Sequence, residues 1–335
     1  MALSPRPFRS HLLAWYASHA RQLPWRETCD PYRVWLSEIM LQQTRVAAVL
    51  DHYREFLRRF PTVQKLAAAR EASVLSAWSG LGYYRRARML YRAAKLIVKE
   101  RKGNFPTTAA EWRQLPGVGR YTAAAIASIA FGEPVAVVDG NVERVLQRIS
   151  GHRLAGEELW TSAEKLLDPT RPGDFNQAMM ELGATVCTPR APVCLTCPVM
   201  HLCAARGELP GSVKPPRQKN RDIHYALDSR DGEVLLVQRP HNARLMPGMW
   251  ELPEIAHSTN HAKPAFTLKH SITVTDYTVH VWRISAVAPP FSRSLPEGGH
   301  AGKWIPLTKL PKLPLTGLAR KILRQAGIIA TGTRT

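Results

Sequence analysis

Long apolar runs are missing from this chain of 335 residues. No stretch reaches the roughly 18 apolar residues of a membrane helix, so no membrane span is expected. The segment Met1 to Ser10 carries charge and proline but no apolar signal core, and we expect a cytoplasmic, nucleoid-associated protein.

Acidic residues are scarce, with 26 Asp and Glu against 46 Lys and Arg and a formal net charge of +20. That imbalance indicates a polyanionic partner, either nucleic acid or an anionic membrane surface.

Cysteine is also scarce, but four of the five cysteines lie close together. Cys187, Cys194, Cys197 and Cys203 have the spacing C-x6-C-x2-C-x5-C, which leaves Cys29 apart. Four-cysteine zinc sites usually pair two C-x2-C knuckles across a longer insert, whereas this segment has one knuckle with a single cysteine on either side. The asymmetry favours a [4Fe–4S] cluster over zinc, and either metal centre over free thiols or disulfides. Clustered thiols fit a reducing compartment.

Changes of periodicity predict two domains. Residues 8–205 carry apolar residues at three- and four-residue spacing, as amphipathic helices do, and include the cysteine loop 187–203. The helical stretches expected there are Pro31–Phe60, Val63–Trp78, Arg85–Lys102, Tyr121–Phe131 and Leu159–Leu167. Residues 206–221 are basic and proline-rich, which indicates a semi-extended linker.

The remaining residues, 222–330, change to the period of strands. Val234–Gln238 and Ile272–Ile284 are expected to be strands, and Leu315–Ala326 a closing helix. The predicted fold class is therefore a multidomain chain, with an all-α domain followed by a smaller α/β domain.

A glycine-rich turn in the segment LPGVGRYTA precedes the helix expected from Tyr121. Gly117 and Gly119 permit backbone conformations closed to other residues and let a phosphate approach the main-chain N–H groups. The positive N-terminal end of the helix adds to this attraction. The pattern predicts a clamp for DNA phosphate that ignores base sequence, with an ordinary turn between helices as the alternative.

Asp139 follows an apolar run and precedes a predicted helix, so it could cap that helix or stabilise a cation. The order of the glycine turn, Asp139 and the cysteine loop resembles the endonuclease III superfamily of DNA glycosylases, over roughly residues 10–205. The resemblance implies a helix-hairpin-helix fold of two lobes, with the damaged nucleotide flipped into the cleft between them. It also implies that Asp139 lies at this cleft.

Tyr121 stands where the bifunctional members of that superfamily carry a lysine. The lysine amine forms a Schiff base with the sugar and so leads to strand cleavage. A phenol cannot form an imine, so we expect a monofunctional glycosylase that uses water.

Glu38 interrupts the apolar face of a predicted helix, beside Val34, Trp35 and Leu41. Burial there raises the pKa of a carboxyl and makes it a plausible proton donor, although a glutamate at a surface edge is the alternative. The segment SEIMLQQT resembles the adenine DNA glycosylases of the MutY type. In that family this glutamate protonates the adenine.

Further positions are implied by the same resemblance. Gln43 matches a residue that wedges into the duplex, and Tyr83 lies in a segment that resembles the lesion-side loop. Tyr83 or its neighbour Tyr84 could instead pack in the core. Other residues expected to bind DNA or substrate are Arg26, Asn141 and the second active-site glutamate, Glu181.

Two segments, Arg239-Pro240 and Met246–Pro253 (MPGMWELP), together resemble the start of a Nudix fold. The R-E-x-x-E-E pattern that holds Mg²⁺ in active Nudix hydrolases does not follow, so the fold is implied without the hydrolase activity. MutY-type enzymes use such a domain to recognise 8-oxoguanine. The hairpin that would contact the lesion reads Ile272-Thr273-Val274, where Thr273 keeps a hydroxyl but the family histidine is missing.

The sequence therefore predicts a monomeric base-excision-repair glycosylase that removes adenine opposite 8-oxoguanine or guanine in double-stranded DNA. Glu38, Asp139 and Tyr121 are the candidate catalytic residues. A mismatch thymine glycosylase would share Tyr121, Asp139 and the cysteine loop, but would not need Glu38 or the C-terminal domain. A redox sensor that binds DNA without catalysis would leave Glu38 and Asp139 without a role.

Overall fold

The structure is a computed structural model, and it describes residues 4–209, 219–243, 245–255, 263–272, 275–284 and 302–330. The chain forms two compact units. The first consists of Met1–Ala68 and Met89–Val213, and the second of Ala69–Arg88 and Lys214–Thr335. Most of the predicted linker lies outside the described residues. In the part described, no helix has the length and apolar character needed to cross a membrane.

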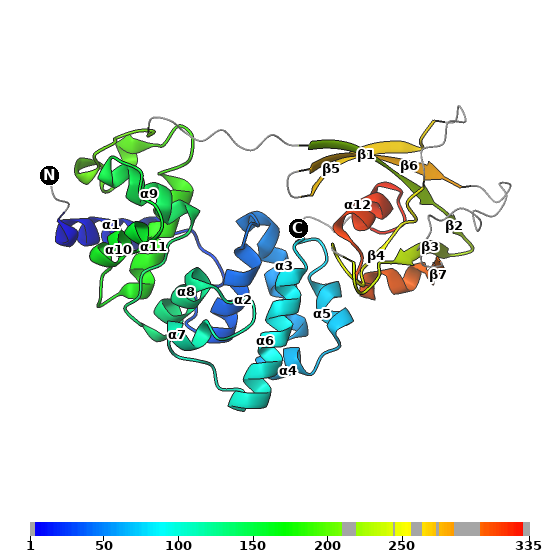
Figure 1. Cartoon of the computed structure of the whole chain (residues 1–335), viewed down its shortest axis with the longest axis horizontal. Helices are drawn as coiled ribbons and strands as arrows, with labels where there is room; N and C mark the ends of the chain where they lie inside the picture. Colours follow the sequence, from blue (N-terminus) through cyan, green and yellow to red (C-terminus); the bar gives the residue numbers. More distant parts are fainter. Residues whose placement is uncertain are drawn as a thin grey trace. The chain divides into compact units, whose positions relative to one another are not determined.

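The first unit is helical (Figure 1). Its helices are α1 (Pro5–His19), α2 (Pro31–Leu41), α3 (Val46–Arg59), α4 (Val63–Ala67), most of α6 (Arg85–Arg101), α7 (Ala109–Trp112), α8 (Arg120–Phe131), α9 (Gly140–Ser150), α10 (Glu157–Leu166) and α11 (Pro172–Thr185). The cysteine loop adds two short 3₁₀ helices, η1 (Cys194–Thr196) and η2 (Met200–Leu202). Helix α8 packs against α2, α7 and α11, and α11 packs against α1 and α9.

Two predicted helices are each broken in the structure. The stretch Pro31–Phe60 divides into α2 and α3 around Gln43, whose φ of 54° is left-handed and cannot occur inside a right-handed helix. The stretch Val63–Trp78 divides into α4 and α5 (Glu71–Ala77), with Ala68 as the C-cap of α4. Neither break contains a glycine or proline, so the sequence carries no strong signal of where the chain turns.

Small residues allow the central helices to approach closely. Helix α8 buries four alanines, Ala123, Ala124, Ala125 and Ala127, and so presents little side-chain bulk to its neighbours. A Cβ atom added at Gly173 of α11 would lie 2.8 Å from the carbonyl oxygen of Ser128 and 2.9 Å from the Cα of Ile129. The α8–α11 crossing therefore requires glycine at this position.

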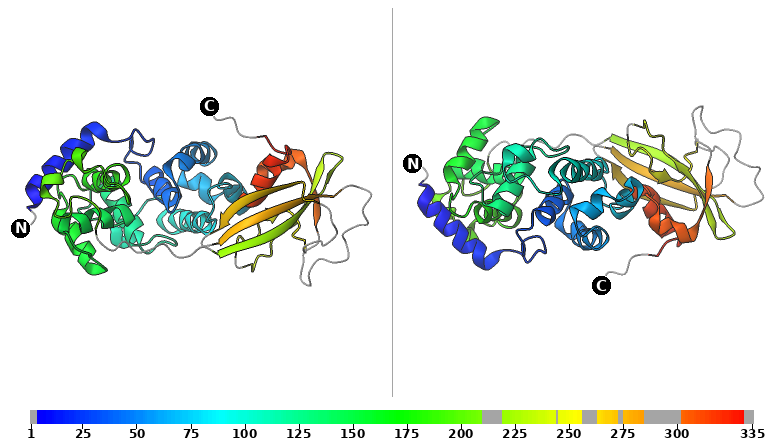
Figure 2. Two further views of the ribbon diagram at one scale, coloured as in Figure 1. Left: turned by 90° about the horizontal axis from the view of Figure 1, so that it is seen from above. Right: turned by 90° about the horizontal axis from the view of Figure 1, so that it is seen from below.

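The second unit contains two sheets and one long helix (Figure 1). One sheet has the order β1 (Lys219–Leu227), β6 (Thr275–Arg283), β5 (Phe266–Ile272), in which β1 is parallel to β6 and β5 is antiparallel to it. Figure 2 shows these three strands side by side. In the other sheet, β3 (Glu233–Gln238) pairs antiparallel with β2 (Ser229–Arg230), β4 (Trp250–Glu251) and β7 (Lys303–Pro306).

Helix α12 (Gly317–Gln325) completes the second unit, after the 3₁₀ helix η3 (Leu307–Lys312). Leu318, Ile322 and Leu323 of α12 are buried in one core with residues of both sheets. The predicted strand Val234–Gln238 and the closing helix are confirmed, and the predicted strand Ile272–Ile284 corresponds to β6, which begins at Thr275 because Ile272 is the last residue of β5. Helix α5 also belongs to this unit, where the Ser76 hydroxyl donates to the carbonyl of Pro311.

The close crossing of α8 and α11 gives a test of the packing. Gly173→Ala should lower the free energy of unfolding by about 1–3 kcal/mol, because its methyl group would overlap backbone atoms that cannot move independently. Gly317→Ala is the control, since nothing lies within 4 Å of its added Cβ. Urea denaturation of both variants measures the difference. Equal stability of Gly173→Ala and the parent chain would contradict the packing described here.

Candidate active site

A buried carboxyl and a phenol from two different helices meet in the first unit. Glu38 of α2 is only 6% exposed, and the hydroxyl of Tyr121 on α8 donates to its Oε2 at 2.8 Å. The same hydroxyl lies 3.1 Å from the sulfur of Met180 on α11. The structure thus rules out the surface-edge position that was the alternative for Glu38.

The surroundings of Glu38 favour its neutral form. Burial raises the pKa of Glu38 to about 7, against the opposing effect of the hydrogen bond from Tyr121, and the charge of Asp139 raises it further. Burial, followed by the charges of Glu38 and Asp139, raises the pKa of Tyr121 well above its ordinary value. Tyr121 therefore stays a neutral hydrogen-bond donor, and Glu38 can hold or release a proton near neutral pH.

Asp139 caps helix α9. Its Oδ1 accepts from the backbone N–H groups of Asn141 at 2.9 Å and Val142 at 2.7 Å. The structural role that the sequence left open is thus present, and it fixes the orientation of the carboxylate. The charge of Asp139 also acts on Glu38 and Tyr121, so the three predicted catalytic residues form one electrostatic group.

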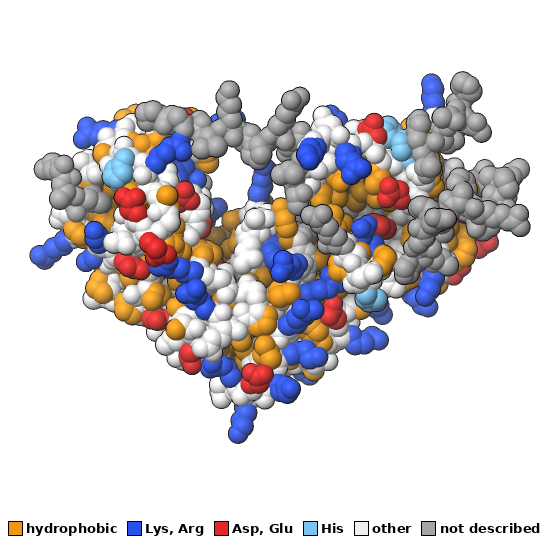
Figure 3. Space-filling model, viewed as in Figure 1, with side chains coloured by type: hydrophobic (Ala, Val, Ile, Leu, Met, Phe, Trp, Pro, Cys, Tyr) orange, Lys and Arg blue, Asp and Glu red, His pale blue; other side chains and the backbone are white. Residues whose placement is uncertain are grey.

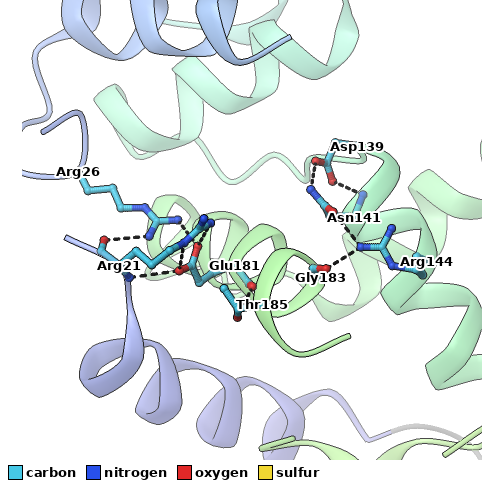
Figure 4. A network of polar contacts seen from close by, with 8 residues as sticks. All are labelled: Arg21, Arg26, Asp139, Asn141, Arg144, Glu181, Gly183 and Thr185. Atoms are coloured by element: carbon cyan, nitrogen blue, oxygen red, sulfur yellow. Dashed lines mark hydrogen bonds and ion pairs between the residues drawn. The ribbon is translucent and has the colours of Figure 1, made fainter. Parts of the chain in front are cut away.

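A hydrogen-bonded chain leads from Asp139 to the cysteine loop (Figure 4). The amide of Asn141 donates to Asp139 Oδ2 at 2.9 Å, and Arg144 donates to Asn141 Oδ1 at 2.8 Å. Arg144 also donates to the carbonyl of Gly183 at 2.6 Å and to that of Cys187 at 2.7 Å. Asn141 is therefore placed to orient Asp139 rather than exposed as a separate binding group.

Glu181 is fully buried and held by two arginines (Figure 4). Arg21 donates from Nε and Nη2 to the two carboxylate oxygens at 2.7 Å each, and Arg26 donates at 2.8 Å. Burial alone would raise the pKa of Glu181, but the hydrogen bonds from Arg21 and Arg26 outweigh it and lower the pKa to about 2. Glu181 thus stays ionised, and Arg26 is committed to it rather than projecting as a free cation.

The two glycines of the predicted phosphate clamp differ. Gly117 has a φ of 78°, and a Cβ there would lie 2.4 Å from the Cβ of Met89. Gly119 is the N-cap of α8 with an ordinary φ of −88°, and nothing lies within 4 Å of an added Cβ. Gly117 is needed for the turn, and Gly119 leaves the helix N-terminus open to approach.

Two predicted DNA-contacting residues, Gln43 and Tyr83, lie outside the group formed by Glu38, Tyr121 and Asp139. Gln43 follows α2, is exposed and has a left-handed φ of 54°. Tyr83 belongs to the second unit, has a φ of 46° and is 46% exposed, whereas Tyr84 is buried, so one of the two tyrosines is a core residue. Such backbone outliers are common at functional sites. Thr273 lies outside the described residues.

The four clustered cysteines line one small cavity. Cys187, Cys194, Cys197 and Cys203 share it with Arg148, which is buried and donates to the sulfur of Cys187 at 3.3 Å. Among the described residues, no group of three or more His, Cys, Asp or Glu side chains is arranged to hold a metal ion. Cys29 is exposed and does not line this cavity.

Basic side chains are abundant on the surface. On the face shown in Figure 3, Lys and Arg cover more of the surface than Asp and Glu do. Helix α6 carries seven basic residues and one acidic residue, Glu100. Arg85, Arg92, Lys95 and Lys99 are exposed, whereas Arg86, Arg88 and Arg101 are partly buried. This distribution suits a polyanion such as DNA.

Comparison with known proteins identifies the family. Residues 36–169 match the HhH-GPD superfamily of base excision DNA repair proteins, and residues 224–325 match the NUDIX domain. The solved structure of a thermostable thymine-DNA glycosylase is 31% identical to this chain, which covers 96% of that protein, with a TM-score of 0.57. The chain belongs to the HhH-GPD superfamily. An endonuclease III–DNA structure, 24% identical with a TM-score of 0.53, shares the fold of this superfamily.

Within the superfamily, the predicted resemblance to adenine DNA glycosylases is confirmed. The human adenine DNA glycosylase is 42% identical over 313 residues, and the *Arabidopsis thaliana* enzyme is 38% identical over 317. These alignments cover 74% and 79% of this chain. The chain spans 57% of the human protein and 50% of the plant protein, so about half the length of each relative.

Several residues that build this site were not predicted from the sequence. Arg144 stands three residues after Asn141 on α9, and that helical spacing could have indicated their contact. Arg148 follows one turn later and lies against the cysteine loop. Arg21 is 160 residues from its partner Glu181, and no local pattern links the two.

The raised pKa of Glu38 predicts a pH-dependent stability. The folded state binds the proton more tightly than the unfolded state, so stability is lost as pH rises from about 4.5 to about 7. Glu38→Gln removes this loss, and its stability relative to the parent should improve by about 3 kcal/mol between pH 4.5 and pH 8. Urea denaturation of both proteins at the two pH values measures it. A constant difference would mean that Glu38 has an ordinary pKa.

Proposed function

We propose that this protein is a monomeric, monofunctional glycosylase that removes adenine mispaired with 8-oxoguanine or guanine in duplex DNA. The observation that carries the proposal is the Glu38–Tyr121 contact, with Asp139 acting electrostatically on both residues. The adenine DNA glycosylases to which the chain is similar support adenine as the base. The basic surface and the open N-terminus of α8 support DNA as the substrate.

Glu38 supplies the proton in this proposal. Flipping the adenine out of the duplex brings it to the buried carboxyl, which donates a proton to a ring nitrogen. Protonated adenine is a better leaving group, so the bond between the base and the sugar C1′ breaks with its electron pair on the base. Tyr121 holds Glu38 in place through its hydroxyl, since the phenol remains protonated.

Asp139 stabilises the positive charge that develops on the sugar. Two backbone N–H groups and the Asn141 amide fix the carboxylate, so it need not reorganise as the charge forms. Water then attacks C1′ and gives a proton to the Glu38 carboxylate, which was left ionised by the first step, so free adenine and an abasic site remain. Covalent attack by Asp139 on C1′ is the variant known from retaining glycosidases. Tyr121 offers no amine for an imine, so the DNA strand stays intact.

The four cysteines fit a [4Fe–4S] cluster. They line one cavity and supply four sulfur ligands, the usual donor set of such clusters. Their spacing, with one C-x2-C knuckle and a single cysteine on either side, favours such a cluster over zinc. When bound, the cluster would stabilise the loop that follows α11.

A thymine glycosylase is the second candidate, because the solved thymine-DNA glycosylase covers 60% of this chain at 31% identity. Two observations favour adenine. Glu38 is buried with a pKa near 7, as a proton donor to a base requires, and residues 224–325 form an additional NUDIX domain.

Excision from defined duplexes tests the function. Under single-turnover conditions, the protein should release adenine opposite 8-oxoguanine and guanine, and should release no thymine from a T:G duplex. Glu38→Gln should bind DNA normally but excise adenine about 10²–10⁴ times more slowly, the usual contribution of general acid catalysis. Glu55→Gln, an exposed carboxyl on α3, is the matched control. Near-normal excision by Glu38→Gln, or release of thymine, would contradict the proposal.

Metal content tests the cofactor independently. The purified protein should be yellow-brown and contain about four iron atoms per chain. Cys197→Ser should lose the iron and the colour, whereas Cys29→Ser should keep both, because Cys29 does not line the cavity. Colourless protein with one zinc ion per chain would overturn the assignment.

A further inference from the structure

The loop that carries Tyr83 is built into the second unit. Residues Ala69–Arg88 group with the C-terminal sheets and helix α12, although the rest of the helical region forms the first unit. Tyr83 is 46% exposed, more than any other large aromatic residue among those described. Gly80, Gly82 and Tyr83 have φ values of 112°, 71° and 46°. A tyrosine keeps a left-handed backbone only when its surroundings hold it there.

One carbonyl oxygen holds both ends of this loop. Ser79 donates from Oγ to the carbonyl of Leu315 at 2.7 Å, and Tyr84 donates from its hydroxyl to the same oxygen at 3.2 Å. Arg320 of α12 donates from Nε to Ser79 Oγ at 3.0 Å. Ser79, Tyr84 and Leu315 are all buried. We call these four residues, Ser79, Tyr84, Leu315 and Arg320, the Leu315 clamp.

Backbone hydrogen bonds attach the Leu315 clamp to β4, in the sheet formed by β2, β3, β4 and β7. The backbone N–H of Trp250 in β4 donates to the carbonyl of Pro314, and that of Thr316 donates to the carbonyl of Trp250, each at 2.9 Å. Leu315 therefore sits between two backbone hydrogen bonds to the core of the second unit. A carbonyl held in this way offers both lone pairs in fixed directions, so it defines the positions of Ser79 and Tyr84.

The loop also has internal supports that present the Tyr83 ring. Trp78 donates from Nε1 to the carbonyl of Gly82 at 3.1 Å, and Arg86 donates to the carbonyls of Leu81 and Gly82 at 3.3 Å each. The guanidinium of Arg86 lies 5.3 Å from the centre of the Tyr83 ring. An exposed aromatic ring beside a cation suits stacking on a nucleobase next to a phosphate backbone.

We propose that Ser79, Tyr84 and Arg320 are positioning residues that set Tyr83 for stacking on DNA, so that the C-terminal part of the chain contributes to mispair recognition through the Leu315 clamp. This inference rests on the proposed function. In this proposal the NUDIX-like part positions Tyr83, in addition to any contact that it makes with the lesion itself. The clamp joins residues about 236 positions apart in sequence, and all four of its residues belong to the second unit.

The first arm of the test measures the loop itself and needs no catalysis. Hydrogen–deuterium exchange in peptides covering residues 79–84 should be faster in Ser79→Ala and Arg320→Gln than in the parent. Ser229→Ala and Arg324→Gln are matched controls in the same unit. Ser229 also donates to a backbone carbonyl, and Arg324 is an exposed arginine one turn further along α12. Unchanged exchange in both clamp variants would overturn the proposal.

The second arm asks whether the clamp acts through Tyr83. It measures affinity for a duplex with 8-oxoguanine opposite a 2′-fluoro-adenosine, which resists cleavage, relative to the same duplex with guanine. Ser79→Ala and Arg320→Gln should each lower this preference about threefold to tenfold, the range for one hydrogen bond. In a Tyr83→Ala background the same changes should alter it less than about twofold, because coupled residues are not additive. Arg320→Lys, which keeps a cationic donor, should restore part of the preference.

Equal effects in the two backgrounds would show that the clamp does not act through Tyr83 and would overturn the inference. The two proposals fail separately. If the parent protein releases no adenine, the proposed function fails, whereas faster loop exchange and a Tyr83-dependent change in DNA affinity would still support the clamp.

Discussion

The burial of one carboxyl against one phenol is the constraint on which the rest of the helical unit depends. For Glu38 to meet Tyr121, helices α2 and α8 must lie close together, and the buried alanines of α8 allow this. Helix α11 must approach from the other side to bring Met180 to the same hydroxyl, and Gly173 permits that crossing. The packing thus costs stability at neutral pH, since it desolvates an ionisable group, and this cost gives the group its chemistry.

Two buried carboxyls of the first unit are kept in different states by their surroundings. Glu38 has a neutral donor and little solvent, and its pKa rises to about 7. Glu181 is equally buried but has two arginines, and its pKa falls to about 2. The carboxyl of Asp139 is held differently again, by the backbone N–H groups of Asn141 and Val142 at the start of α9. The different surroundings of Glu38 and Glu181 thus suit these two carboxyls to different roles: Glu38 can donate a proton, whereas Glu181 remains an anion.

Features with a local signature were predictable from the sequence, and those that depend on distant contacts were not. The glycine turn, the cysteine spacing, β3 and α12 each have a short pattern, and the structure shows an element at each of these places. The breaks between α2 and α3 and between α4 and α5 were missed because neither is marked by a glycine or proline. The pairing of Arg21 with Glu181 and the grouping of residues 69–88 with the C-terminal sheets arise only when the chain is folded. The sequence also could not separate two roles of Asp139, because helix capping and catalysis would each place an aspartate at this position.

The most direct measurement of the central claim is the titration of the Glu38 carboxyl itself. Protein labelled with ¹³C at the glutamate side-chain carboxyl, compared with the Glu38→Gln variant to assign the signal, gives this pKa by NMR. The account predicts a midpoint near 7 for Glu38, because burial opposes its ionisation. A midpoint close to the ordinary value of about 4.3 would show that the carboxyl is ionised at neutral pH, and it could not then serve as the proton donor.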